Sequence, residues 1–137
     1  MRYLQKIFIM VFLACGGYSC NTTELNNNAE IKFKTTEIDY GELKYNGNGN
    51  CTFEFTNSGN TPLVIQYVKT SCGCTVPEWP NKLIKPGKTS GIKINYDTKH
   101  PGTFYKTITV YYNGKNSPVT LFIKGSVGYP EEIANTF

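Results

Sequence analysis

The feature that most constrains the fold is a repeated alternation of apolar and polar residues, broken at short intervals by turn-forming residues. In the segment Cys51–Thr56, for example, Cys51, Phe53 and Phe55 fall on one face, which is typical of a strand with one buried side. Comparable segments recur along the chain, and no helical period of useful length separates them. The strands expected from this pattern are 31–40, 51–56, 63–68, 75–76, 91–96, 104–112 and 119–123.

The spacing of these strands predicts the fold class. Roughly seven short strands, with turn signals about every 8–12 residues, predict an all-β, immunoglobulin-like antiparallel β-sandwich. The predicted domain, residues 31–128, has the usual size for such a sandwich, and residues 129–137 are expected to form a loose C-terminal tail. The segment 63–68 is apolar at nearly every position, so we expect it to be a central strand.

The beginning of the chain resembles an export signal. Arg2 and Lys6 precede an apolar run at Ile7–Ala14, and small residues lead from it to Cys20. A charged start, an apolar core of about eight residues and a small-residue end are typical of a secretory signal peptide rather than a transmembrane helix. The last part, Gly17–Cys20, resembles a lipobox, the motif at which bacterial lipoproteins receive lipid on a cysteine.

We therefore predict a lipoprotein signal peptide at residues 1–19 and lipid attachment at Cys20. Cys15 is a second candidate for the lipidated residue, and signal-peptidase cleavage without lipidation is the alternative. Residues 20–30 are polar and rich in asparagine, which predicts a flexible tether. These features predict a cell-envelope protein that is lipid-anchored to a bacterial membrane, at the outer membrane or the periplasmic face, and they do not indicate the leaflet.

Charge gives no indication of a nucleic-acid partner. The whole chain has a formal net charge of +4, and two of its 14 basic residues, Arg2 and Lys6, lie in the predicted leader. The remaining 12 lysines are nearly balanced by 10 acidic residues. No arginine remains to recognise phosphate or guanine with two hydrogen bonds. The sequence also contains no recognisable Ser/His/Asp arrangement or glycine-rich phosphate loop, so we expect no catalysis.

One stretch, Thr70–Pro80, departs from the strand pattern and concentrates unusual residues. It contains Cys72, Gly73 and Cys74 together with Trp79, the only tryptophan of the chain. After export, oxidation is the default fate of paired thiols. A bond between Cys72 and Cys74 would close a very small ring, for which Gly73 supplies backbone freedom.

Cys51 is an alternative disulfide partner for Cys72 or Cys74. The strand that begins at Cys51 and the strand that ends near Thr70 are expected to have their far ends at the same end of the sandwich. Removing the leader with Cys15 and lipidating Cys20 would leave three cysteines, an odd number, so one thiol would remain free, blocked or paired between molecules. The sequence leaves this connectivity open.

Three interpretations of the Cys72-Gly73-Cys74 motif compete. The first is structural, with a disulfide or buried thiols fixing a loop, while Trp79 caps the core or, alternatively, presents its surface to a sugar ring. The second is metal binding, in which the two thiolates and His100 would bind copper or zinc. The third is thiol–disulfide exchange. His100 lies beside a Pro-Gly turn and is a weak candidate ligand, and the structural interpretation requires no cofactor.

Several segments of the chain resemble one bacterial family, and the motif Ser71–Thr75 is highly specific to it. The segments are Phe53–Gly59, Pro62–Ile65, Ser71–Pro80, Ile84–Gly87, Tyr96–Lys99 and Pro101–Gly102. The family is the domain-of-unknown-function family 1573, itself similar to the Hydin-type immunoglobulin-like domains, and the resemblance covers about residues 31–127. It implies secreted or lipid-anchored envelope proteins with an immunoglobulin-like sandwich and no established reaction. Cys51 departs from the family pattern, so the resemblance implies no pairing for it.

Together these observations predict a lipid-anchored cell-envelope module that binds or scaffolds a partner, which would be an envelope protein or a glycan. The lipid anchor supplies the expected contact with the membrane. The alternative is an envelope accessory protein for thiol redox or metal handling that uses the motif Cys72-Gly73-Cys74. The sequence indicates neither the partner nor the oligomeric state.

Overall fold

The computed structural model describes residues 28–131 of the 137-residue chain. Eight β-strands make up this region, and none of its helices is long and apolar enough to cross a membrane. The predicted leader, the lipidation candidates Cys20 and Cys15, and most of the predicted tether lie outside the described residues. The strands are β1 (Ile31–Phe33), β2 (Glu37–Leu43), β3 (Asn50–Asn57), β4 (Ile65–Thr70), β5 (Thr75–Glu78), β6 (Thr89–Tyr96), β7 (Gly102–Tyr112) and β8 (Val119–Val127).

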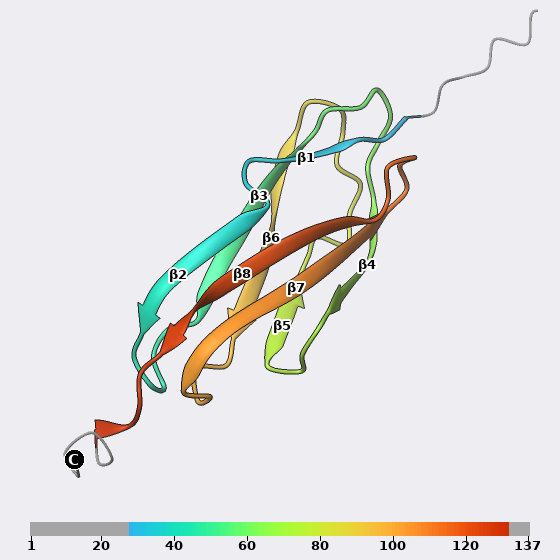
Figure 1. Ribbon diagram of the computed structural model, residues 1–137. Helices are drawn as coiled ribbons and strands as arrows, with labels where there is room; N and C mark the ends of the chain where they lie inside the picture. The colour runs from blue at the N-terminus through green and yellow to red at the C-terminus, as the bar shows by residue number, and fades with distance from the viewer. Residues whose placement is uncertain (1–27, 132–137) are drawn as a thin grey trace, which may run out of the picture.

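The strands form two four-stranded sheets that pack face to face (Figure 1). One sheet has the order β1-β3-β6-β5 and the other has the order β2-β8-β7-β4. The prediction of an all-β, immunoglobulin-like sandwich is confirmed, with eight strands instead of about seven. The chain crosses from the first sheet to the second between Phe33 and Glu37, so the expected first strand is two strands. β2 pairs in parallel with β8, whereas the other pairings are antiparallel.

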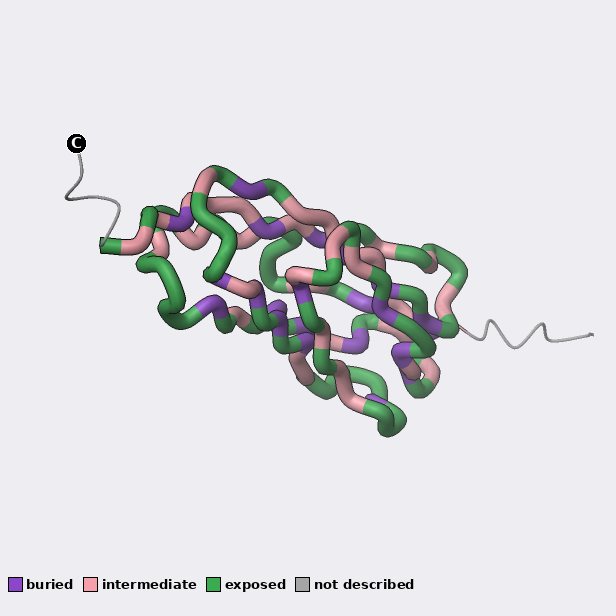
Figure 2. The backbone as a smooth tube through the Cα atoms, turned by 90° about the horizontal axis from the view of Figure 1, so that it is seen from below, coloured by how far each residue is buried: buried purple, intermediate pink, exposed green. Residues whose placement is uncertain are grey.

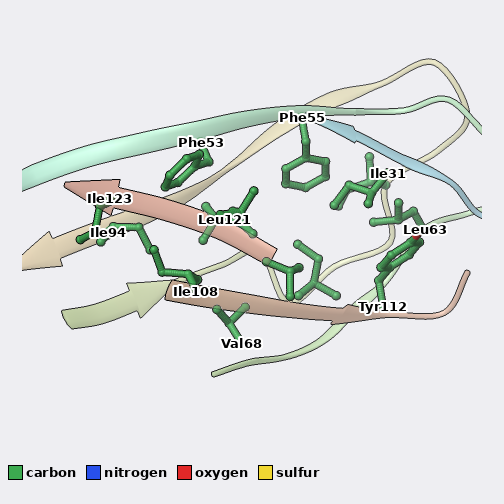
Figure 3. Close-up of a cluster of buried hydrophobic side chains, with 14 of the residues drawn as sticks. Ile31, Phe53, Phe55, Leu63, Val68, Ile94, Ile108, Tyr112, Leu121 and Ile123 are labelled. Carbon is green, nitrogen blue, oxygen red and sulfur yellow. The ribbon is translucent and has the colours of Figure 1, made fainter. Parts of the chain in front are cut away.

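The core lies between the sheets and follows from the alternation in the sequence. Phe53 and Phe55 of β3 point inward toward Ile108 of β7 and Leu121 of β8 (Figure 3). These four side chains are at most 1 % exposed. Buried and exposed residues alternate along several strands (Figure 2), which is the pattern expected where each sheet has one solvated face. Truncation of one such side chain to alanine costs about 2–5 kcal/mol.

The expectation that 63–68 is a central strand is wrong. β4 is an edge strand that pairs with β7 alone, and Leu63 lies before it in an isolated bridge to Ile84. The register of β4 shifts between Ile65 and Tyr67, and this irregularity turns Tyr67 outward. Apolar residues therefore occur on both faces of a strand that is buried on only one.

The two ends of the sandwich carry different parts of the chain. At one end, the described chain begins at Asn28, whose carbonyl accepts a hydrogen bond from the Asn60 backbone N–H at 3.0 Å. At the opposite end lie the turns 44–49, 71–74 and 97–101, which we call the distal end (Figure 1). There the Asn46 backbone N–H donates to the carbonyl of Thr98 at 3.1 Å. The sandwich thus separates the N-terminal start of the domain from the Cys72-Gly73-Cys74 motif.

Candidate functional site

The connection between β4 and β5 contains the motif Cys72-Gly73-Cys74. β4 and β5 are edge strands of different sheets, and the connection passes from one sheet to the other. Cys72 and Cys74 form a disulfide whose Cα atoms are 5.2 Å apart, and both residues are half-buried. Of the connectivities that the sequence left open, the structure contains the small ring.

Hydrogen bonds hold both sides of this ring to neighbouring strands. On the β4 side, the Ser71 backbone N–H donates to the carbonyl of Thr107 at 3.0 Å, and the Thr107 N–H donates back to the Ser71 hydroxyl at 3.1 Å. On the β5 side, the Asp97 N–H donates to the carbonyl of Cys74 at 2.8 Å. Thr107 belongs to β7 and Asp97 follows β6, so each sheet fixes one side of the ring.

Further hydrogen bonds shape the ring from inside. The backbone N–H of Cys74 donates to the sulfur of Cys72 at 3.1 Å. The carbonyl of Cys72 accepts from the Thr75 N–H and from the Thr70 hydroxyl, each at 3.1 Å. Gly73 at the tip is exposed, and a side-chain atom added there would meet nothing within 4 Å. The ring is therefore fixed at its base and open to solvent at its tip.

The Cys72–Cys74 disulfide contributes little to stability by constraining the chain. The two cysteines are two positions apart, so the bond closes a loop of three residues. The chain-entropy relation gives about 1.6 kcal/mol for a loop of this length, against about 3 kcal/mol for a 15-residue loop. The bond also joins two positions of one short connection rather than two separate strands. This disulfide therefore does not act as a structural cross-link between the two sheets.

Cys51 has a different environment and keeps a free thiol. It lies on the inward face of β3 near the distal end, opposite Ile94 in the register with β6, and it packs against the core. Burial raises the pKa of the Cys51 thiol, and hydrogen bonding with the Tyr40 hydroxyl opposes only part of this effect. Cys51 is therefore a protonated thiol at neutral pH and is not bonded to Cys72 or Cys74.

His100 does not join the two cysteines. It lies exposed in the turn between β6 and β7, where its Nε2 is 3.4 Å from the Oδ2 of Asp97. Among residues 28–131, no three or more histidine, cysteine, aspartate and glutamate side chains group as they would to hold a metal ion. The geometry thus brings no third ligand to Cys72 and Cys74, and it gives no support to the copper or zinc interpretation.

Trp79 follows an edge strand of the first sheet and contacts an edge strand of the second. It follows β5, is half-buried and packs against the core, while its ring meets that of Tyr67 edge-on, with centroids 6.5 Å apart. Tyr67 in turn meets Tyr111 of β7 with centroids 6.0 Å apart. Trp79 therefore connects the end of β5 with Tyr67 of β4 and adjoins the aromatic side chains of the second sheet.

This aromatic surface was not identified from the sequence. On the outward face of β7, Tyr105 is 56 % exposed and contacts the ring of Phe122 on β8 with centroids 5.5 Å apart. Tyr67 is 54 % exposed and lies opposite Tyr111 in the β4–β7 register. We call Tyr67, Tyr105, Tyr111 and Phe122 the aromatic face. The signal for this surface in the sequence was a set of aromatic residues in the strand 104–112, at the solvent-facing positions between the buried positions.

Comparison with known proteins assigns the chain to a family. Residues 31–127 match the family described as a protein of unknown function, DUF1573. The chain belongs to this family. The resemblance noted in the sequence is thereby confirmed, over the region that was expected. No curated protein matches the sequence at a significant level.

Solved structures confirm the fold of this DUF1573 domain. A protein of unknown function from Porphyromonas gingivalis W83 superposes with a TM-score of 0.65 at 19 % identity, covering 74 % of this chain and 48 % of its own. The ASH/PapD-like domain 7 of human CEP192 superposes with a TM-score of 0.63 at 8 % identity, covering 87 % of this chain and 99 % of its own. A chain of the CsuC–CsuE complex of Acinetobacter baumannii superposes with a TM-score of 0.53 at 14 % identity, covering 78 % of this chain and 64 % of its own. The chain thus spans about half of the Porphyromonas chain, and these similarities establish a PapD-like, immunoglobulin-like fold.

Proposed function

We propose that this DUF1573 domain is a binding module of the bacterial cell envelope that contacts a protein partner through its aromatic face. The observation that carries the proposal is the exposure of Tyr67 and Tyr105, each more than half accessible, on one face of the second sheet. Two aromatic pairs lie on this face, Tyr67 with Tyr111 and Tyr105 with Phe122, and grouped exposed apolar side chains mark interaction sites more often than single ones do. Tyrosine and tryptophan are also enriched in the energetically important centres of protein interfaces.

The aromatic face adjoins an edge that suits a polypeptide. β4 is the outer strand of its sheet, and no strand of the described chain pairs with its second edge. The N–H and C=O groups along such an edge pair with an extended peptide, while neighbouring side chains provide specificity. A glycan lacks the regular backbone that matches a strand edge. The combination of Tyr67 on β4 with this edge therefore favours a protein over a glycan.

A protein partner also agrees with one of the similar structures. CsuC is a chaperone found in a complex with the tip subunit CsuE. That complex concerns its own proteins, and at 14 % identity the likeness shows the fold alone. It supports a protein partner as the first class to test.

A lipid anchor at Cys20 would orient the domain. The described chain starts at Asn28, at the end of the sandwich opposite the distal end (Figure 1). Attachment through a preceding segment would direct the distal end, with Cys72 and Cys74, away from the membrane. Metabolic labelling with a clickable fatty acid tests the anchor: Cys20→Ser is expected to abolish labelling, and Cys15→Ser to retain it. Labelling that depends on Cys15 would show that Cys15 carries the lipid instead. Absence of labelling in the wild type would exclude a lipid anchor.

Site-specific photocrosslinking tests the binding surface. A crosslinking amino acid at position 105, on the aromatic face, is expected to capture one defined envelope protein in intact cells. The same group at position 52, on the outer face of the first sheet, is the matched control. The captured protein is then purified, and its affinity for the wild type is compared with that for Tyr67→Ala/Tyr105→Ala. Equal affinities, equal capture at both positions, or binding only to glycans would overturn the proposal.

A further inference from the structure

We propose that Cys72 and Cys74 form a thiol–disulfide exchange site that transfers its disulfide to a dithiol of an envelope protein. The site is separate from the aromatic face, and its activity goes beyond binding. The disulfide joins two positions of one short connection and links no two strands, so a structural role explains little of its presence. Its placement at the distal end makes it available to another protein.

The loop keeps its shape without the disulfide. Ser71 is bound to Thr107 through two hydrogen bonds, and the carbonyl of Cys74 is bound by the Asp97 N–H at 2.8 Å. These contacts use backbone groups and one serine hydroxyl, and none of them depends on the bond between the sulfurs. The reduced cysteines would therefore stay close together, which allows the disulfide to form again without refolding of the loop.

Access to the sulfurs comes from the tip of the ring. Gly73 is exposed and leaves open space around its Cα, so no side chain of the described region covers the tip. Cys72 and Cys74 are both half-buried rather than enclosed. Exchange requires a thiolate to approach a disulfide sulfur directly, and in this proposal the approach is from the exposed tip.

The surroundings of the two sulfurs assign them different roles. Cys74 packs against the hydrophobic core, whereas Cys72 is not among the side chains that do. The Cys74 backbone N–H donates to the sulfur of Cys72 at 3.1 Å. A hydrogen bond from an N–H stabilises negative charge on the acceptor, so it favours the thiolate form of Cys72 once the disulfide opens. Cys72 is thus the exchanging cysteine, and Cys74 is the resolving cysteine.

The exchange is a balanced two-electron transfer. A thiolate of the partner attacks the sulfur of Cys72 and forms a mixed disulfide, while the bond between Cys72 and Cys74 breaks and Cys74 leaves as a thiolate that takes a proton from solvent. A second partner thiolate then attacks the partner's own sulfur, and Cys72 leaves as a thiolate. The partner dithiol is oxidised to a disulfide, and the pair is reduced to two thiols.

Cys51 is the internal control for this site. It lies in the same domain but faces the core on β3, where its thiol packs beside Tyr40. Burial raises the pKa of Cys51, so little thiolate is present at neutral pH. A reaction that reflected general thiol chemistry would proceed at all three cysteines, whereas exchange specific to the ring spares Cys51.

The first experiment uses the full mature chain with glutathione as the probe. In oxidised glutathione, Cys74→Ser is expected to form a mixed disulfide at Cys72 at least tenfold faster than Cys72→Ser forms one at Cys74. Peptide mapping by mass spectrometry identifies the modified sulfur, and Cys51→Ser is expected to behave as the wild type. Reduced glutathione is expected to open the wild-type disulfide while Trp79 fluorescence stays native. Equal rates in the two variants, or reduction only under unfolding conditions, would overturn the proposal.

The second experiment identifies the partner class in cells. In Cys74→Ser the Cys72 thiolate attacks the oxidised partner, which is the reverse of the transfer, and no Cys74 thiol is present to complete that reaction. Mixed disulfides between Cys72 and an envelope protein are therefore expected to accumulate and to disappear on reduction. Cys72→Ser should accumulate none, and it serves as the matched control. Adducts with small thiols alone would exclude a protein substrate, and protein adducts at equal levels in both variants would exclude the assigned roles.

Discussion

The side-chain amide of Asn57 donates a hydrogen bond to the backbone carbonyl of Ile84 at 2.9 Å in the interior of the sandwich. The same amide donates to the carbonyl of Thr61 at 2.8 Å, and its oxygen accepts from the Gly59 N–H at 3.0 Å. Asn57 is 0 % exposed, so this buried polar side chain has partners for both of its polar atoms. It joins the end of β3 to the loops that precede β4 and β6.

Replacement of Asn57 is therefore expected to destabilise the domain strongly. Asn57→Ala leaves three backbone groups without this partner, and we expect a loss of about 2–4 kcal/mol in the free energy of unfolding. Urea unfolding followed by circular dichroism measures the loss. Asn95→Ala is the matched control, because Asn95 makes an exposed hydrogen bond to Asn50, and it should change the value by less than about 0.5 kcal/mol. Similar losses in the two variants would contradict the role of Asn57.

Tyr67 controls the exposure of Trp79. The ring of Tyr67 meets the indole edge-on, and Trp79 is the only tryptophan, so the tryptophan fluorescence comes from this residue alone. Tyr67→Ala is expected to shift the emission to longer wavelength and to increase quenching by acrylamide by about twofold, since solvent replaces the tyrosine ring. Tyr129→Ala removes an exposed tyrosine beyond the end of β8 and should leave both properties unchanged. An unchanged spectrum in Tyr67→Ala would show that other groups shield the indole.

The core was predictable because period-two alternation encodes it directly. The inward positions expected in 51–56, 91–96 and 104–112 are those that the structure buries, apart from Cys51, which is half-buried. The switch of sheets before Glu37 was not predictable, because no glycine or proline marks residues 34–36. The edge position of β4 was missed because its register shift places apolar residues on both faces, a pattern that sequence alone assigns to a central strand.

The candidate site was only partly predictable. The motif Cys72-Gly73-Cys74 is visible as a break in the strand pattern, but spacing alone allowed Cys51 to pair with either cysteine. The structure resolves this choice, because Cys72 and Cys74 are bonded to each other and Cys51 keeps a free thiol. The aromatic face depends on residues from three strands that become neighbours only through the sheet order, so the aromatic residues at alternate positions of 104–112 did not by themselves reveal it.

Cys51 gives the domain a specific response to alkaline pH. Burial raises the pKa of its thiol above the ordinary value of 9.0. The unfolded chain therefore releases this proton at a lower pH than the folded domain. Below the pKa that the thiol has in the unfolded chain, its contribution to the free energy of unfolding is complete. This contribution is lost as the pH rises toward the pKa of the thiol in the folded domain, by at most about 1.4 kcal/mol per pH unit.

A comparison of the wild type with Cys51→Ala isolates this effect. Urea unfolding at pH 7 and at pH 9.5 should show the wild type losing more than the variant, by up to about 1 kcal/mol. The tyrosines of the unfolded chain remain mostly protonated over this range, so they contribute little to the difference. A difference that stays constant between the two pH values would mean that the Cys51 thiol titrates alike in both states.

Reduction of the Cys72–Cys74 disulfide is expected to leave the domain folded and only slightly less stable. The chain-entropy relation gives about 1.6 kcal/mol for the three-residue loop, whereas a bond from Cys51 to Cys74 would enclose a much longer loop worth about 3.4 kcal/mol. The free energy of unfolding is measured in urea for the oxidised protein and for protein kept reduced with dithiothreitol. Cys51→Ser should show the same small difference, because its thiol takes no part in the bond. A loss above about 3 kcal/mol that disappears in Cys51→Ser would contradict the observed pairing, since only a longer cross-link constrains the unfolded chain to that extent.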